Sequence, residues 1–390
     1  MDSRARLQMA LKHQEADRIP LDIGGTHLSS IHVQAYRRLR NHLGLAVDEI
    51  RLMDVFQQIA EIDDDLRALW GMDVRYVAPN DASTYRRTIL DMGEYVGFYD
   101  EWGIGWKMPK DGGWYFDQFF HPLAEAQTLA DIERYPFPDP EDTARYEGLA
   151  ERSRHAAHVE RLGVFLGCMC SGILELAAWL RGFENFYADL ITNEKLAVGL
   201  MRRILEIKLR YWEIALQEAG ENADVVAEAD DLGAQLRPLI SPATYRRLIK
   251  PLHQELFDFI HARTQAKLFF HSCGAIRPLI PDLIEVGVEV LNPVQVSAAG
   301  MDSAELKRAF GRELVFWGGG VDTQCVLTNG TPAQVKDDVR RRIEDLAPGG
   351  GFIFAPVHNI QGNVPPQNIL AMWEAWQEYG NYSKTFQVVS

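Results

Sequence analysis

The sequence has few cysteines, with four among 390 residues. Four are too few for a disulfide framework in a chain of this length. No apolar run approaches the roughly 18 residues that a membrane span requires, and the first twenty residues lack the continuous apolar segment of a signal peptide. These absences predict a cytoplasmic protein with reduced thiols and no membrane partner.

Basic residues are also scarce, because 40 Lys and Arg stand against 55 Asp and Glu and give a formal net charge of -15. Such a surface repels a phosphate backbone, so nucleic acid is not an expected partner. The composition of 47% hydrophobic and 24% charged residues, without a low-complexity tract, predicts a packed core throughout. We therefore expect a globular enzyme that acts on a small molecule.

Short apolar runs alternate with stretches whose apolar residues are three or four apart, which is the β/α alternation of a parallel sheet. A doubly wound sheet would produce the same alternation. The count of eight runs favours a (β/α)8 TIM barrel that forms a single domain over residues 1–390. The predicted strands are residues 19–23, 74–78, 163–166, 224–227, 267–270, 289–292, 313–317 and 352–355.

Helices are predicted between these strands, for example at residues 243–263, 304–310 and 332–346, the last after a Thr331-Pro332 start signal. The helical spacing of Leu7, Ala10 and Leu11 predicts an N-terminal helical extension. Two segments depart from the repeat. Residues 84–120 are rich in glycine and aromatic residues and predict a β-rich insertion, and residues 135–142 read as an extended, proline-rich connection.

Unusual polar residues follow nearly every predicted strand. In a TIM barrel the groups that perform chemistry gather at the carboxyl ends of the strands. The sequence therefore predicts a reactive mouth to which many strand ends contribute, namely Asp22, Gly24, Glu228, Asp231, Gln235, His271, Cys273, Gln295, Asp322, Gln324, His358 and Asn359.

The segment KLFFHSCG is the most specific local indication of a functional site. Residues two apart on an extended segment point the same way, so His271 and Cys273 can converge on one cation such as zinc, which accepts nitrogen and sulfur ligands. A third ligand must come from another strand. His358, after the last strand, is favoured over Cys325, which lies where a helix is expected to begin. Cys168-x-Cys170 has the same spacing, but its apolar surroundings favour packing.

The acidic run of Glu228, Asp230 and Asp231 has two interpretations. Carboxylates at a strand end can act as a general base, anchor a substrate or support a metal-ligating histidine. They can equally cap a loop by accepting backbone amides. Both interpretations stay open at this point.

Several long segments together resemble the uroporphyrinogen decarboxylase superfamily, and within it the zinc-dependent corrinoid methyltransferases. These are SRARLQMALKHQEADRIPLDIGG, AEADDLGAQLRPLISPATYRRLIKPLHQEL, FFHSCGAIRPLIPDLIEVGVEVLNPVQ and FAPVHNIQGNVPPQNI. The arginine-rich segment with which true uroporphyrinogen decarboxylases grip substrate carboxylates is missing, since the corresponding stretch reads DIGGTHLSSIHVQAYRRL. The resemblance thus favours the methyltransferases over the decarboxylases.

The resemblance implies zinc bound by His271 and Cys273, with His358 at the position of the family's third ligand, a cysteine. Gln295 falls where the family can supply an acidic ligand. Asp231 and Glu228 would handle protons, while Asp322, a catalytic candidate, would orient substrate with Gln324. Substrate contacts are further expected from Asp22, Gly24, Gln235, Gln295 and Asn359.

The implied reaction moves a methyl group between a small methylated substrate or thiol and a corrinoid. The chain has no Asp-x-His-x-x-Gly corrinoid-binding segment, so methylcobalamin must come free or on a separate protein. The alternatives are a lyase that decarboxylates a small carboxylate and a barrel without catalytic activity. A homodimer, with aromatic residues of the insertion at the contact, is left open.

Overall fold

The computed structural model describes residues 1–385. Within them a parallel sheet has the strand order β13-β12-β11-β10-β9-β8-β3. Its strands match seven of the eight predictions to within a few residues. They are β3 (Val74–Val77), β8 (Gly163–Leu166), β9 (Val225–Ala229), β10 (Lys267–His271), β11 (Val290–Asn292), β12 (Val315–Trp317) and β13 (Phe352–Ile353).

The first predicted strand, at residues 19–23, was wrong as a strand, because it forms only an isolated parallel bridge between Leu21 and Phe354. It still lies between the two edges of the sheet. The amide of Asp22 donates to the carbonyl of Phe354 (2.8 Å), and the amide of Asp73 donates to the carbonyl of Leu21 (2.9 Å). Pro20 has no amide hydrogen, which limits the pairing. The segment closes the sheet into the expected TIM-barrel-like fold.

Successive side chains along each strand point to opposite faces of the sheet and so form two apolar layers. Val225 and Ala227 of β9 and Phe269 of β10 face the barrel interior, while Val226 and Phe270 face the surrounding helices. The predicted N-terminal helix is α1 (Ser3–Leu11), and its Leu7, Ala10 and Leu11 join the interior cluster. This helix closes the amino-terminal end of the barrel and leaves the opposite end as the mouth.

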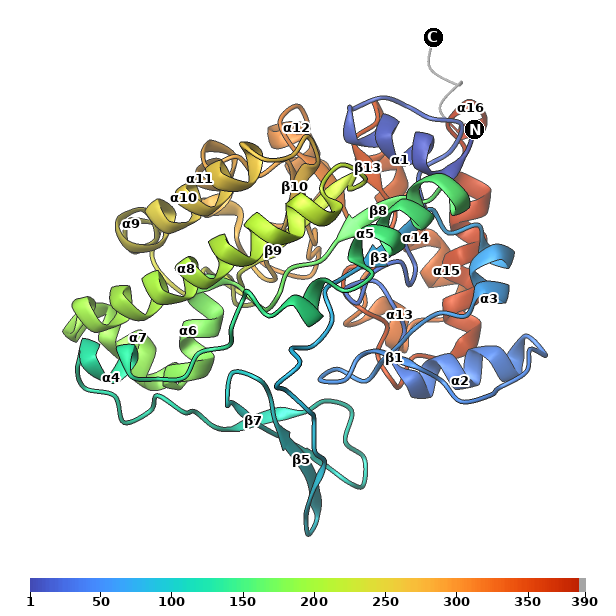
Figure 1. Ribbon diagram of the computed structural model, residues 1–390. Helices are drawn as coiled ribbons and strands as arrows, with labels where there is room; N and C mark the ends of the chain where they lie inside the picture. The colour runs from blue at the N-terminus through green and yellow to red at the C-terminus, as the bar shows by residue number, and fades with distance from the viewer. Residues whose placement is uncertain (386–390) are drawn as a thin grey trace.

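Helices cover the outside of the barrel (Figure 1). The longest helix, α8, runs beside β9, and two of its side chains bind Glu228. The helices are α2 (Val33–His42), α3 (Asp64–Trp70), α4 (Leu129–Glu133), α5 (Leu149–Arg154), α6 (Ile173–Arg181), α7 (Phe183–Thr192), α8 (Glu194–Ala219), α11 (Ile280–Glu285), α12 (Ser303–Phe310), α13 (Val326–Asn329), α14 (Pro332–Leu346), α15 (Pro366–Tyr379) and α16 (Tyr382–Thr385), with short 3-10 or π turns η1 (Thr143–Tyr146), η2 (His155–Glu160) and η4 (Arg277–Leu279).

The helix predicted at residues 243–263 is continuous but irregular. It consists of α9 (Pro242–Thr244), a π turn η3 (Tyr245–Ile249) and α10 (Lys250–His261). Pro251 cannot donate a backbone hydrogen bond, and a π turn in the preceding segment accommodates this loss. The helix begins after a capping residue, since the Ser241 hydroxyl accepts from the amide of Thr244 (3.0 Å).

The predicted β-rich insertion is a four-stranded antiparallel sheet that projects from the mouth end of the barrel (Figure 1). Its strands are β4 (Leu90–Met92), β5 (Tyr95–Tyr99), β6 (Gly105–Pro109) and β7 (Asp117–Phe120). A small pair, β1 (Leu52–Asp54) and β2 (Ile59–Ala60), precedes it. The proline-rich connection at residues 135–142 forms neither helix nor strand, and it turns at residues 135–137 and 140–141 instead of running fully extended as predicted.

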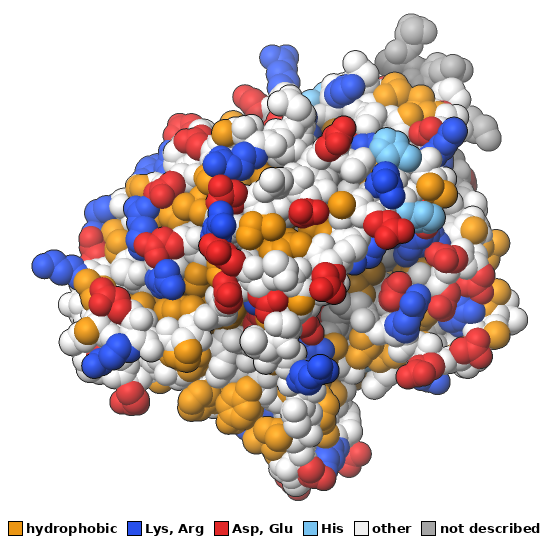
Figure 2. All heavy atoms as spheres, in the orientation of Figure 1, with side chains coloured by type: hydrophobic (Ala, Val, Ile, Leu, Met, Phe, Trp, Pro, Cys, Tyr) orange, Lys and Arg blue, Asp and Glu red, His pale blue; other side chains and the backbone are white. Residues whose placement is uncertain are grey.

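Acidic and basic side chains are interspersed over the face in Figure 2, and hydrophobic side chains gather around the insertion. Leu90, Met92, Tyr99 and Phe120 of the insertion are exposed. None of the helices in residues 1–385 is long and apolar enough to cross a bilayer.

Candidate metal centre

The three predicted ligands meet at the mouth of the barrel. His271 is the last residue of β10, Cys273 follows two residues later, and His358 lies in the loop after β13. One possible ligand atom from each lies within 4.8 Å of the others. The Cys273 Sγ and His271 Nε2 atoms are 3.5 Å apart, close to the spacing of roughly 3.5 Å between ligand atoms around a tetrahedral zinc. The donor set of two imidazoles and one thiol therefore fits zinc in chemistry, and the pair of His271 and Cys273 also fits it in spacing.

The orientation of His271 is fixed by the neighbouring strand. Its Nδ1 is 2.5 Å from Oδ1 of Asn292, the residue that pairs with it in the parallel register. Asn292 Nδ2 donates to the carbonyl of Trp317 (2.7 Å), which settles which end of the amide faces His271. An amide oxygen only accepts, so Nδ1 carries the proton and Nε2 keeps a free lone pair. Without a metal, the Cys273 thiol can donate to that lone pair.

The ligand groups are neutral in the metal-free protein. Burial lowers the pKa of His271, and burial together with His271 lowers the pKa of His358. Burial, and after it the carboxylates of Asp231 and Glu175, raise the pKa of the Cys273 thiol well above its usual range. A divalent cation would reverse this by favouring the thiolate.

Asp231, a predicted catalytic residue, does lie at this centre. Its Oδ1 accepts from the amide of Cys273 (2.8 Å) and is 3.8 Å from His271 Nε2. Gly274, at φ 89°, turns the chain directly after Cys273, where a Cβ would lie 2.4 Å from the backbone of Gly233. This close approach of two loops places the Asp231 carboxylate beside the ligands.

Sequence reasoning missed Glu175 and His27. Glu175 lies in the first turn of α6 and accepts from the Ser171 hydroxyl. Burial, then Asp231, raise its pKa well above the usual range. An acidic residue within the apolar run ILELAAWL was a signal that could have revealed it. His27 packs edge to face on Tyr76, with ring centroids 5.4 Å apart, and its proximity lowers the pKa of His271.

The other two acids of the run have structural roles. The predicted catalytic residue Glu228 points out of the barrel, where it binds Lys208 Nζ (2.8 Å) and Trp212 Nε1 (2.5 Å) of α8. Alternation on β9 turns it to the helix layer, so the structure corrects its assignment to the mouth. Asp230 accepts from the amides of Leu174 (2.9 Å) and Glu175 (2.7 Å) at the start of α6.

The glutamines predicted to contact substrate form a strip along the rim. Gln295 Oε1 accepts from the amide of Gly274 (2.7 Å), and its Nε2 donates to Gln235 (3.2 Å). Ser297 extends the strip, accepting from Gln235 through its carbonyl (2.5 Å) and donating to Gln324 through its hydroxyl (2.8 Å). The strip joins the loops after β9, β11 and β12.

Asp322, Asp22 and Gly24 have local partners. Asp322 Oδ1 accepts from the amides of Gln324 (2.9 Å) and Cys325 (3.2 Å) and so caps the turn before α13, a role that competes with its predicted catalytic one. Buried Asp22 accepts from Trp317 Nε1 (2.8 Å), and Trp317 is the residue whose carbonyl orients Asn292. Gly24 has φ 95°, and Ile62 leaves no room there for a Cβ.

The remaining cysteines lie outside the cluster. Cys325 is exposed just before α13. Burial raises the pKa of the thiols of Cys168 and Cys170, and both lie near the ammonium group of Lys208. Both side chains pack against the hydrophobic core, which agrees with the prediction that Cys168-x-Cys170 packs.

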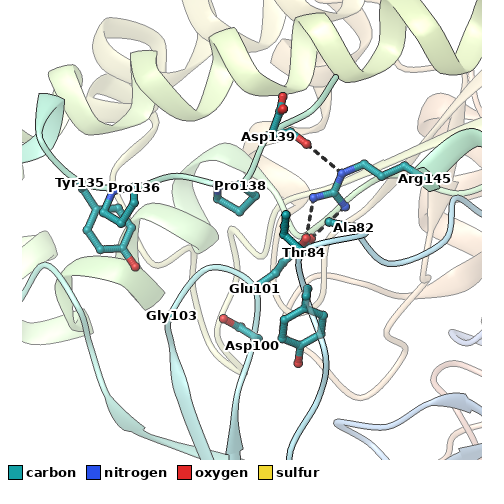
Figure 3. Close-up of a pocket in the computed structure, with 11 residues that line it drawn as sticks. Ala82, Thr84, Asp100, Glu101, Gly103, Tyr135, Pro136, Pro138, Asp139 and Arg145 are labelled. Atoms are coloured by element: carbon teal, nitrogen blue, oxygen red, sulfur yellow. Dashed lines mark hydrogen bonds and ion pairs between the residues drawn. The ribbon is translucent and has the colours of Figure 1, made fainter. Parts of the chain in front are cut away.

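A pocket of about 270 Å3 lies away from this centre, between the insertion and the proline-rich connection (Figure 3). Arg145 on its wall is already bound by the Asp139 carbonyl (2.9 Å) and by both carboxylate oxygens of Glu101. The charged groups that line it thus have partners within the protein.

Fold and site together define a β/α barrel with three side chains at its mouth that could hold a metal ion. The sequence profile of uroporphyrinogen decarboxylase (URO-D) matches residues 101–379, and the chain belongs to this family. A uroporphyrinogen decarboxylase of Alkalilimnicola ehrlichii is 26% identical over 384 residues, covering 95% of this chain and 92% of the relative. A methyltransferase from Methanosarcina mazei has the same fold, with a TM-score of 0.64, 19% identity and coverage of 97% and 99% of the two chains.

Proposed function

We propose that this protein is a zinc-dependent methyltransferase, which moves a methyl group between a small methylated substrate or thiol and a corrinoid or similar one-carbon carrier. The observation that carries the proposal is the convergence of His271, Cys273 and His358, with ligand atoms within 4.8 Å of one another. A set of three protein ligands at a barrel mouth leaves a position for substrate, as catalytic zinc sites do.

Zinc bound there would act as a Lewis acid that stabilises a thiolate or the leaving heteroatom of a methyl donor. The residues of the chain prepare this chemistry. Asn292 keeps His271 Nε2 free of a proton, and Asp231, 3.8 Å from that nitrogen, is the group available to take up or return a proton. The glutamine strip offers amide donors and acceptors to a neutral substrate.

The runner-up is a lyase that decarboxylates a small carboxylate, favoured by the name of the curated relative. The charges at the mouth weigh against a polycarboxylate substrate. Asp231 and Glu175 are acidic, and in the described residues neither has a lysine or arginine partner. A substrate with many carboxylates would meet the negative charge of Asp231, with no lysine or arginine bound to that carboxylate in residues 1–385.

Metal analysis of the purified protein tests the proposal. We expect about one zinc per chain in the wild type and in Cys325→Ser, an exposed control. We expect strongly reduced zinc in His271→Ala, Cys273→Ser and His358→Ala, because each removes one ligand.

The activity test is a screen of methylated amines, ethers and thiols with and without added cobalamin, with cobalamin absorbance as the readout. Methyl transfer by the wild type that is lost in folded His271→Ala supports the proposal. Unchanged turnover in that variant contradicts it, and release of carbon dioxide without a methyl acceptor favours the lyase. A separate corrinoid protein is the expected partner if free cobalamin reacts slowly.

A further inference from the structure

We propose that the four-stranded insertion supports the metal centre through Tyr115, which acts by way of Asn359 to hold His358 as a ligand. Tyr115 lies between β6 and β7 and is far from His358 in sequence. The inference rests on the proposed function, since it assigns His358 to the metal.

Asn359 is the junction of this arrangement and is fully buried. Its Oδ1 accepts from the Tyr115 hydroxyl (3.2 Å) and from Gln361 Nε2 (2.8 Å), and it lies 3.0 Å from His358 Nδ1. Its Nδ2 donates to Gln57 Oε1 (2.7 Å). These partners hold the amide with its oxygen towards His358.

This orientation decides which ring nitrogen of His358 carries the proton. An amide oxygen cannot donate, so Nδ1 must hold the hydrogen and Nε2 is left with a lone pair for a metal. His271 is held in the same way by Asn292. A cysteine ligand would need no such partner, whereas a histidine ligand has a second nitrogen that must be satisfied.

Tyr115 is itself held firmly in place. On one side of it the Trp114 carbonyl lies 3.1 Å from His32 Nε2, and on the other side the Phe116 amide donates to the Phe56 carbonyl (2.9 Å). The His32 amide in turn donates to the carbonyl of Ile360, next to Asn359 (2.8 Å). The insertion is thus tied through His32, by its side chain on one side and its backbone amide on the other, to the loop that carries His358.

The test compares the zinc affinity of Tyr115→Phe and Asn359→Ala with that of the wild type, by competition with a chromophoric chelator. Tyr99→Phe, an exposed tyrosine of the same sheet, is the matched control. We expect the dissociation constant to rise about 10- to 100-fold in Asn359→Ala, as for other partners of ligating histidines. In Tyr115→Phe we expect about fivefold, the effect of one lost hydrogen bond, and in Tyr99→Phe no change.

A second readout separates a positioning role from a structural one. Nitrogen-15 NMR of the histidines in the metal-free protein should show His358 protonated at Nδ1 in the wild type. Asn359→Ala should show a mixture of tautomers, and the absorption spectrum of the cobalt-substituted protein should shift. A purely structural role would lower the thermal midpoint and leave the tautomer and the spectrum unchanged.

The outcomes distinguish this inference from the proposed function. If the wild type binds no zinc, or His358→Ala binds it as tightly, the proposed function fails. If zinc needs His358 but Tyr115→Phe matches the wild type in affinity and spectrum, the role of Tyr115 is refuted and the function stands. Tyr115→Phe keeps the ring, so it decides the question even if Asn359→Ala does not fold.

Discussion

The two ends of the barrel differ in how their carboxylates are paired. At the closed end, Asp73 is fully buried and is bound by Arg6 (2.6 Å) and Arg18 (2.6 Å), and Asp224 is bound by Arg4 (3.0 Å). At the mouth, Asp231 and Glu175 face the Cys273 thiol, and the described residues give neither carboxylate a lysine or arginine partner.

The difference shows which end serves the fold and which serves the chemistry. A buried carboxylate is costly unless an opposite charge compensates it. The chain supplies that charge itself at the closed end. At the mouth Asp231 is partly exposed to solvent, so the acids, the thiol and the two imidazoles can lie together without an internal cation and form a group of side chains that could hold a metal ion.

The largest expected effect is a loss of stability when the buried ion pairs at the closed end are broken. Asp73→Ala leaves Arg18 without its carboxylate, removes one of the two carboxylates that bind Arg6, and removes the acceptor of the Leu21 amide. We expect the free energy of unfolding in urea to fall by about 3–5 kcal/mol, the usual cost of breaking a buried ion pair, with the zinc content retained. Asp64→Ala, at an exposed ion pair with Arg75, should cost at most about 1 kcal/mol. Equal losses in the two variants would contradict the comparison.

Much of the barrel could be predicted because its strands are short apolar runs bounded by turns. The segment at residues 19–23 was misjudged, since strand pairing depends on neighbours that sequence does not show, and Pro20 removes one donor. The β-rich insertion was recognisable from its glycines and aromatic residues, but its contact with the loop at residues 358–360 is a tertiary feature.

The site was partly predictable for the same reason. His271, Cys273 and Asp231 were found because strand ends converge in a barrel. Glu228 was misplaced, because a shift of one residue on β9 sends a side chain to the other face of the sheet. Glu175 and Tyr115 were missed because they come from a helix and from the insertion.

A smaller effect is expected at the mouth when zinc is added to metal-free protein. A ligand that binds only the folded state stabilises it by about 2.7 kcal/mol at a free concentration 100 times its dissociation constant. Thermal unfolding of the wild type should therefore shift upward with zinc, and that of Cys273→Ser should not. If zinc raises the midpoint of both equally, the cation binds elsewhere and the mouth is not its site.

The smallest expected effect is a change in the rate at which the Cys273 thiol at the mouth is alkylated. In metal-free Cys325→Ser protein, iodoacetamide should alkylate Cys273 slowly at pH 8, because burial and the neighbouring carboxylates raise the thiol pKa. Asp231→Asn removes a negative charge and keeps an acceptor for the Cys273 amide. The Cys273 thiolate is then destabilised less, so the pKa of the thiol falls. The pH profile of alkylation therefore moves to lower pH, and the rate at pH 8 rises about threefold to tenfold.

Mass spectrometry of the Cys273 peptide reports this rate separately from those of Cys168 and Cys170. Asp337→Asn, which removes an exposed charge from α14, is the control and should leave the rate unchanged. An equal rate in Asp231→Asn and in the wild type would mean that the carboxylate does not act on the thiol. The pKa of the Cys273 thiol would then be set by burial alone.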